Sequence, residues 1–209
     1  FCYGTLFPAH QMNIQVFLEW FHRLDAFVVA LALCVQLLLA WIWRSSLPRW
    51  LPFVCAYLVV LVGIQGGLGA LTVVQLLPSG VVTAHLALAL TLVASVSALS
   101  QSLLSFSRKS APLWWKFLGG SSLLAVMGQC LVGGRMATEW AAQRCIGQDQ
   151  GCELLNIHRT SAIPVAFLVT LFVVIPLLVG GWSRSQWPFL SAVFVLLLSQ
   201  IALGVAGVH

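Results

Sequence analysis

Long apolar stretches alternate with short polar joints along the whole chain. The apolar stretches cover residues 17–43, 51–75, 81–106, 114–137, 155–181 and 187–209. Each is close to the length of about 20 residues that a helix needs to cross the hydrocarbon core of a bilayer. The pattern therefore predicts six membrane-spanning helices and an all-α fold, that of a polytopic helical membrane protein.

The composition excludes a soluble globular protein. Of the 209 residues, 60% are hydrophobic and 7% are charged, whereas an ordinary soluble domain has roughly 45–50% and 25%. The net charge is +5, and in a polytopic chain such an excess of Lys and Arg usually reports orientation rather than nucleic-acid binding. We therefore expect the lipid bilayer, and no nucleic acid, as a partner.

Positive side chains gather in every second joint. The first, third and fifth joints contain no acid, and their basic residues are Arg44, Arg49, Arg108, Lys109, Lys116 and Arg184. The positive-inside rule places these joints in the cytoplasm and the other joints outside, together with residues 1–16. Because the chain starts with Phe1 rather than Met and stops within an apolar stretch, we expect a fragment that lacks the first and last spans.

Two motifs occur twice, at offsets that agree within one residue. They are His22-Arg23 with His158-Arg159, and Gln65-x-x-x-Gly69 with Gln200-x-x-x-Gly204. Such a repeat is typical of membrane proteins built from tandem halves. We therefore expect two duplicated four-helix bundles, with eight spans in the whole protein, and we divide this chain into residues 1–110 and 111–209.

Three histidines are expected at one depth, within one or two turns of the outer ends of their spans. They are His22, His85 and His158. Intramembrane ionisable residues are rare and usually functional, although each could instead be an interfacial side chain bonded to a neighbouring helix. Opposed histidines on neighbouring helices suit haem iron, and no tetrahedral set of Cys and His for a structural zinc ion converges.

We accordingly expect two haem sites. His22 and His85 would form a bis-histidine site, and His158 would ligate a second haem. The repeat places the counterpart of His85 beyond residue 209, so the partner of His158 is expected there.

Glu19 lies three residues before His22, so both project from one helix face. A carboxylate there could transfer a proton or stabilise a cation; it could also be an interfacial acid or a partner for Arg23. The matching position of the second half is Leu155. Because the halves share their histidines but not this acid, we expect one haem to be reacted upon and the other to carry electrons.

Three arginines near the outer surface are candidate contacts for haem propionates. They are Arg23, Arg135 and Arg159, and a guanidinium binds carboxylates well. Anchoring to lipid headgroups is an equally open interpretation for each.

The cysteines divide into outer and intramembrane residues. Cys145 and Cys152 lie in a polar outer loop, where such a pair can form a disulfide, either as a structural link or for thiol chemistry. Cys2 is outside and without an evident mate. The intramembrane thiols, which are Cys34, Cys55 and Cys130, are expected to pack as small apolar groups.

Taken together, these motifs resemble those of a known protein family. The segments that carry the resemblance are EWFHR at 19–23, QGGLGALTV at 65–73, TAHL at 83–86, the loop 145–152 and HR at 158–159. The chain resembles haem A synthase, the membrane enzyme that converts haem O to haem A for terminal oxidases, over essentially all of its length.

The resemblance implies an eight-span protein whose N-terminal half binds the substrate haem and whose C-terminal half binds a haem b cofactor. His22 and His85 then face the substrate, His158 ligates haem b, and Glu19 matches the family's essential acid. The implied reaction oxidises a porphyrin methyl group to a formyl group through successive hydroxylations, with water supplying the oxygen. In the family Cys2 would belong to a first-loop pair whose other member precedes residue 1.

The resemblance also implies where the protein works and with what. We expect the inner (plasma) membrane with the haem sites toward its outer face, and haem O synthase and terminal oxidase assembly factors as partners; self-association is left open. Two other functions are considered. A di-haem b electron carrier should space its haems across the bilayer, unlike these histidines, and a haem-handling or chaperone subunit needs no acid beside the iron.

Overall fold

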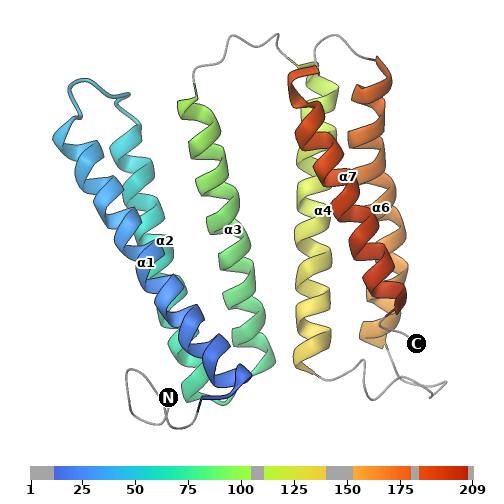
Figure 1. The fold of residues 1–209 in the computed structure, drawn as a ribbon, viewed down its shortest axis with the longest axis horizontal. Helices are drawn as coiled ribbons and strands as arrows, with labels where there is room; N and C mark the ends of the chain where they lie inside the picture. Colours follow the sequence, from blue (N-terminus) through green and yellow to red (C-terminus); the bar gives the residue numbers. More distant parts are fainter. Residues whose placement is uncertain (1–11, 105–110, 140–152, 180–183, 207–209) are drawn as a thin grey trace. The chain divides into compact units, whose positions relative to one another are not determined.

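The computed structural model describes residues 12–104, 111–139, 153–179 and 184–206, and all regular structure in these ranges is helical (Figure 1). The helices are α1 (Ile14–Ile42), α2 (Leu51–Val74), α3 (Ser79–Leu103), α4 (Leu113–Thr138), α6 (Glu153–Val179) and α7 (Trp187–Ala206), with a 3-10 turn at Arg184–Gln186 before α7. All six long helices are long and apolar enough to cross a membrane. The prediction of an all-helical, polytopic membrane protein is confirmed.

The first helix begins three residues before the expected position 17 because of a polar cap. The side chain of Asn13 accepts a hydrogen bond from the amide of Val16 at 2.9 Å, which satisfies one of the unpaired donors at a helix start. Apolar periodicity does not register such a cap. The start of α1 at Ile14 is therefore a local hydrogen-bonding effect added to the apolar pattern.

The chain divides into two compact units between Leu104 and Ser105, and each is described by itself. In the first unit α2 packs against both α1 and α3. In the second unit α6 packs against both α4 and α7. Each unit thus has a middle helix that holds two others.

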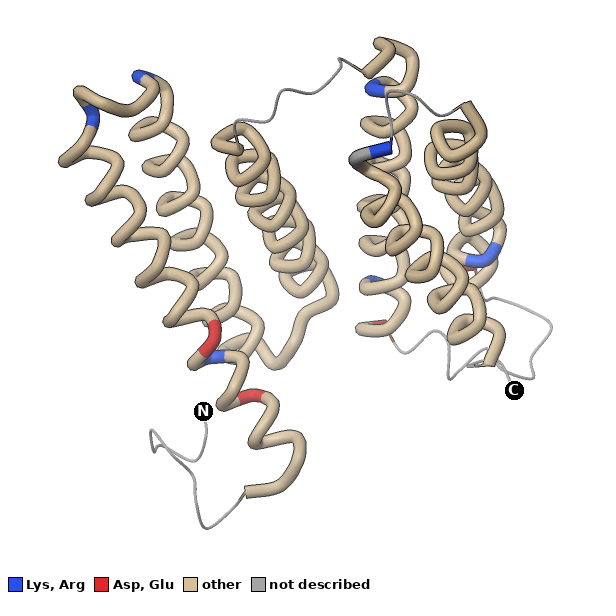
Figure 2. The backbone as a smooth tube through the Cα atoms, turned by 45° about the horizontal axis from the view of Figure 1, so that its top comes forward, with Lys and Arg blue, Asp and Glu red and all other residues tan. Residues whose placement is uncertain are grey.

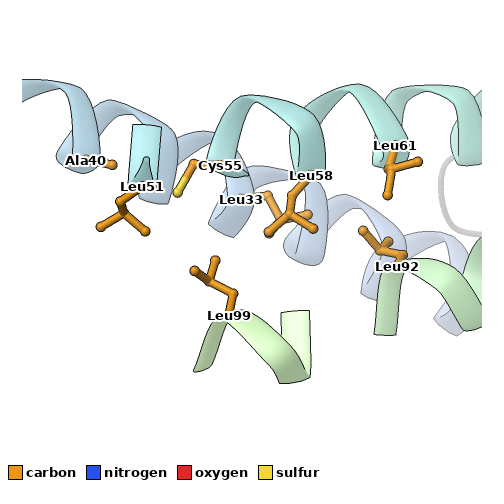
Figure 3. Packing of buried hydrophobic residues seen from close by; sticks show 8 residues of the cluster. All are labelled: Leu33, Ala40, Leu51, Cys55, Leu58, Leu61, Leu92 and Leu99. Atoms are coloured by element: carbon orange, nitrogen blue, oxygen red, sulfur yellow. The ribbon is translucent and has the colours of Figure 1, made fainter. Parts of the chain in front are cut away.

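The core of the first unit is formed mainly by leucines from its three helices. It consists of Leu33, Ala40, Leu51, Cys55, Leu58, Leu61, Leu92 and Leu99 (Figure 3). Leu58 of α2 is completely buried, whereas Phe27 and Leu38 of α1 are exposed. Lipid tails are as apolar as leucine, so van der Waals packing rather than transfer from water stabilises this core.

In the second unit a tryptophan compensates for a proline. Pro176 lies inside α6 and has no N–H, so it cannot bond the carbonyl of Phe172 four residues earlier. The indole nitrogen of Trp115 on α4 donates to that carbonyl at 3.0 Å. The rings of Trp115 and Phe172 stack with centroids 4.8 Å apart. A neighbouring helix thus satisfies the backbone group that the proline leaves unpaired.

Helix α2 ends in a Schellman motif, at the start of its connection to α3. The amide of Leu77 donates to the carbonyl of Thr72 at 2.8 Å, and that of Leu76 donates to Val73 at 3.4 Å, which is the bonding of this motif. The motif needs a left-handed residue, and Leu76 has φ 56°. Pro78 follows and bounds α3 as its N-cap.

Charges differ between the two ends of each unit (Figure 2). One end has only Lys and Arg, which are Arg44 and Arg49 in the first unit and Lys116 and Arg184 in the second; Arg108 and Lys109 lie outside the described residues. The opposite end contains both signs. The histidines and the acid Glu19 lie toward this mixed-charge end, near the starts of α1, α3 and α6.

Candidate functional site

His85 of α3 is half-buried against α2 in the first unit. A Cβ placed on Gly69 of α2 would lie 3.2 Å from Cε1 of His85, so the ring occupies space that a side chain would fill. One turn earlier, Nε2 of Gln65 lies 3.4 Å from Nε2 of His85. The two α2 residues, which we call the first Gln-Gly motif, therefore position this imidazole.

His158 of α6 is held in the same manner by α4 in the second unit. A Cβ on Gly133 would lie 2.9 Å from Cε1 of His158. Nε2 of Gln129 lies 3.1 Å from Nδ1 of His158 and donates to its carbonyl oxygen at 2.7 Å. The hydroxyl of Ser161 donates to Oε1 of Gln129 at 2.7 Å. We call Gln129 and Gly133 the second Gln-Gly motif.

Sequence analysis missed the second Gln-Gly motif. The Gln-x-x-x-Gly spacing occurs four times, at Gln65, Gln129, Gln143 and Gln200, and only the first and last were paired. Gln143 lies outside the described residues. The last occurrence lies on α7, where Gln200 is exposed and a Cβ on Gly204 would meet no described atom within 4 Å. Searching for every copy of the spacing would have found Gln129 and Gly133 but not the histidine that they hold.

His22 of α1 is exposed. The first unit therefore contains both histidines that are expected to share a site, one on α1 and one on α3. His158 belongs to the second unit. Two opposed imidazoles are the usual axial ligands of a b-type haem, and each unit has a histidine toward its own mixed-charge end.

Glu19 forms an ion pair with Arg23, one turn later on α1. Both side chains are about half exposed, at 45% and 42%. The pairing that was one of the open interpretations of Glu19 is therefore present. The guanidinium of Arg23 thus holds the Glu19 carboxylate on the helical turn that precedes His22.

The other two predicted arginines lie at the mixed-charge end of the second unit. Arg135, near the end of α4, donates through Nε to Glu139 at 2.9 Å. Arg159 is exposed on α6, next to His158. Headgroup contact and propionate contact therefore stay the two interpretations of both arginines.

Asp25 is a residue that sequence analysis left out. It lies on α1, three residues after His22, and is exposed. The signal that could have found it is an acid inside an apolar span, which is rare. His22 thus has a carboxylate about one helical turn away on each side, Glu19 before it and Asp25 after it.

A family model described as cytochrome oxidase assembly protein, COX15-CtaA, matches residues 6–209. The chain belongs to this family. The resemblance to the haem A synthase family is thereby confirmed, and a role in cytochrome oxidase assembly follows. Comparisons with the curated proteins and with the solved structures found no match.

The residues of this oxidase assembly protein fit a haem. In the described ranges, no group of three or more His, Cys, Asp or Glu could hold a bare metal ion, whereas a porphyrin needs only axial ligands from the protein. Nδ1 of His85 and Oε1 of Gln65 are buried without a hydrogen-bond partner in the first unit. Buried polar atoms left unpaired are costly, and ligation of His85 would provide a reason for them.

The cysteines add little to the site. Cys2, Cys145 and Cys152 lie outside the described residues, so the disulfide stays a prediction. The three intramembrane cysteines, Cys34, Cys55 and Cys130, are free thiols. Cys55 is buried in the leucine core of the first unit, as apolar packing predicts, whereas Cys34 and Cys130 are exposed.

Proposed function

We propose that this chain is a haem A synthase, which oxidises a porphyrin methyl group of haem O to a formyl group and so provides haem A to terminal oxidases. The observation that carries the proposal is the pair of Gln-Gly motifs. Each unit of an oxidase assembly protein holds a histidine in a matching way, at 3.4 Å from Gln65 and 3.1 Å from Gln129. Among the described residues, only the first unit places a carboxylate one helical turn from its histidine.

In this proposal the two units have different roles. His22 and His85 ligate haem O in the first unit, and His158 ligates haem b in the second. Conversion of the methyl group takes an oxygen atom from water and releases electrons and protons. Haem b held by His158 would pass these electrons on, one at a time, to an electron acceptor outside the protein.

Glu19 serves the first unit by accepting a proton or stabilising positive charge on the substrate. It lies within a turn of His22, so a porphyrin ligated there comes close to the carboxylate. Arg23 pairs with it and so orients the carboxylate. The corresponding residue of the second unit is Leu155, which is half-buried and cannot exchange a proton.

The remaining assignments follow from the same function. Arg135 and Arg159 contact haem propionates at the outer face of the plasma membrane, and Cys145 and Cys152 form a disulfide in the outer loop. Haem O synthase delivers the substrate, and oxidase assembly factors receive the product.

The proposal is tested by extraction and chromatography of the haems bound to the full-length protein, co-expressed with a source of haem O. We expect haem A from the natural sequence and about a hundredfold less from Glu19→Gln, the usual range for loss of a general acid or base. Glu139→Gln is the matched control, because Glu139 also pairs with an arginine one turn away but lies at the end of α4, a helix that contains no histidine.

Two results would contradict the proposal. Haem b alone, with haem O never converted by any variant, would indicate a di-haem electron carrier. Undiminished haem A from Glu19→Gln would indicate a haem-handling subunit whose product is made elsewhere.

A further inference from the structure

The first unit has a groove between its predicted haem ligands and the end that has only Lys and Arg. The groove encloses about 360 Å³ and is lined by all three helices, including Ala32 and Gln36 of α1, Cys55 of α2 and Leu103 of α3. Its wall on α1 begins at Ala32, which follows His22 by about 15 Å along the helix. The groove therefore continues the predicted haem site along the same helix, toward the basic end.

The lining of the groove is aliphatic or aromatic, apart from Cys55 and one amide, that of Gln36. A polar ligand would gain little from such walls, because its hydrogen-bonding groups would stay unpaired. The helices that form the walls are all long and apolar enough to cross a membrane. The ligand chemistry that fits this groove is therefore a flexible hydrocarbon chain.

The second unit has a packed aromatic ring at the corresponding position. At the offset of the repeated His-Arg motif, Gln36 corresponds to Phe172, whose ring stacks on Trp115 with centroids 4.8 Å apart. The same offset pairs Leu33 with Val169, and both are 6% exposed, so α1 and α6 bury equivalent positions at this depth. One unit thus packs an aromatic ring at the position where the other lines a groove.

We propose that this groove holds the isoprenoid chain of haem O while His22 and His85 ligate its iron. The inference rests on the proposed function, in which the first unit binds haem O and the second binds haem b. Haem O has a long isoprenoid chain where haem b has only a vinyl group, on the edge of the ring opposite to the propionates. With the propionates toward the mixed-charge end, the chain runs along α1 toward Ala32, a distance that half a porphyrin and this chain can span.

The groove acts through shape rather than through exclusion of water. Lipid tails are as apolar as its walls, so transfer of the chain out of the bilayer contributes little by itself. A close van der Waals fit distinguishes haem O from haem b. The fit also fixes the orientation of the ring, since a porphyrin without the chain can turn over about the axis that runs between its propionates. The same methyl group is then presented to Glu19 in every turnover.

The test compares the affinities of ferric haem O and ferric haem b for the full-length protein with His158→Ala, by spectroscopic titration in detergent. Gln36→Phe introduces the residue of the second unit and should weaken haem O binding about tenfold, because the ring fills the groove, while haem b binding stays unchanged. Ala32→Trp should do the same from another position on the wall. Leu31→Trp is the matched control, because Leu31 precedes Ala32, is 54% exposed and does not line the groove.

Three results would contradict the inference. Equal weakening of both haems by Gln36→Phe and Ala32→Trp would mean that the groove supports the fold or holds another segment of the chain. Unchanged haem O affinity in both variants would leave the groove to the acyl chain of a lipid. The ligands are tested separately by His85→Ala in the same background, which should abolish binding of both haems. If His85→Ala changes neither affinity, the proposed ligands fail together with the inference.

Discussion

Gly69 and Gly133 are the smallest residues of the candidate site and allow the closest approach in it. An ideal Cβ at Gly133 would lie 2.9 Å from the ring of His158, a distance that real Cβ atoms essentially never show, and one at Gly69 would lie 3.2 Å from His85. The ring of His158 cannot move aside easily, because Gln129 holds it. Each glycine therefore fixes how deeply a histidine sits against the neighbouring helix.

We predict that Gly133→Ala reduces the haem b that copurifies with the protein about tenfold, and that Gly69→Ala has a smaller effect on haem bound to the first unit. The controls are Gly128→Ala and Gly67→Ala on the same two helices, where a Cβ would meet nothing within 4 Å. Alanine forms helices better than glycine, so weaker helices cannot explain a loss. Equal haem content in Gly133→Ala and Gly128→Ala would contradict the prediction.

At the residue scale, the sequence identifies the reactive side chains but not the residues that pack around them. His22, His85, His158 and Glu19 are recognisable because ionisable residues are rare in apolar spans. The role of Gln129 depends on which helix packs against α6, and that neighbour, α4, is set by tertiary packing. No local pattern contains this information.

The packing of α4 on α6 depends on a backbone carbonyl that a proline leaves unpaired. Trp115 donates to the carbonyl of Phe172, which has no amide partner because residue 176 is proline. In a membrane an unpaired carbonyl cannot turn to water. The hydrogen bond therefore connects Trp115 of α4 to the place where Pro176 interrupts the backbone bonding of α6.

We predict that Trp115→Phe, which removes the donor but keeps a stacking ring, lowers the free energy of unfolding by about 1 kcal/mol. In a Pro176→Ala background, where an amide can bond the carbonyl of Phe172, the same substitution should cost less. The measurement is a double-mutant cycle of unfolding in detergent micelles. A cost of Trp115→Phe that is the same in both backgrounds would contradict the explanation.

The end of α2 has a strained residue whose replacement should stabilise the protein. Leu76 has φ 56° and is 89% exposed, so glycine would remove the steric cost of the left-handed conformation without loss of packing. We expect Leu76→Gly to raise the free energy of unfolding by about 1 kcal/mol. Val74→Gly, at the last residue of α2 and also exposed, should lower it by up to about 1 kcal/mol. A destabilised Leu76→Gly would contradict this account of the turn.

The positions of the helices could be predicted well from the sequence, and their exact ends less well. The apolar stretches gave six spans within a few residues, because the length of a bilayer-crossing helix is set by the membrane. The cap by Asn13 and the Schellman motif at Leu76 were not predicted. The first is a side-chain hydrogen bond, and the second has leucine where glycine is the usual signal.

At the scale of the whole molecule, both units position a histidine with a glutamine and a glycine of a neighbouring helix. The first unit positions His85 with the middle helix α2, while the second positions His158 with the outer helix α4. The sequence repeat indicated that the halves are related, but it paired Gln65 with Gln200 rather than with Gln129. Two copies of the Gln-x-x-x-Gly spacing therefore hold a histidine, and the spacing does not by itself identify equivalent helices.

The central claim is that each unit binds its own haem, a substrate in the first and haem b in the second. The most direct measurement is the identity and amount of each haem extracted from full-length His85→Ala and His158→Ala proteins co-expressed with a haem O source. We predict that His158→Ala loses haem b and keeps haem O, whereas His85→Ala keeps haem b and loses both haem O and haem A. Loss of the same haems from both variants, or of none from either, would contradict the account.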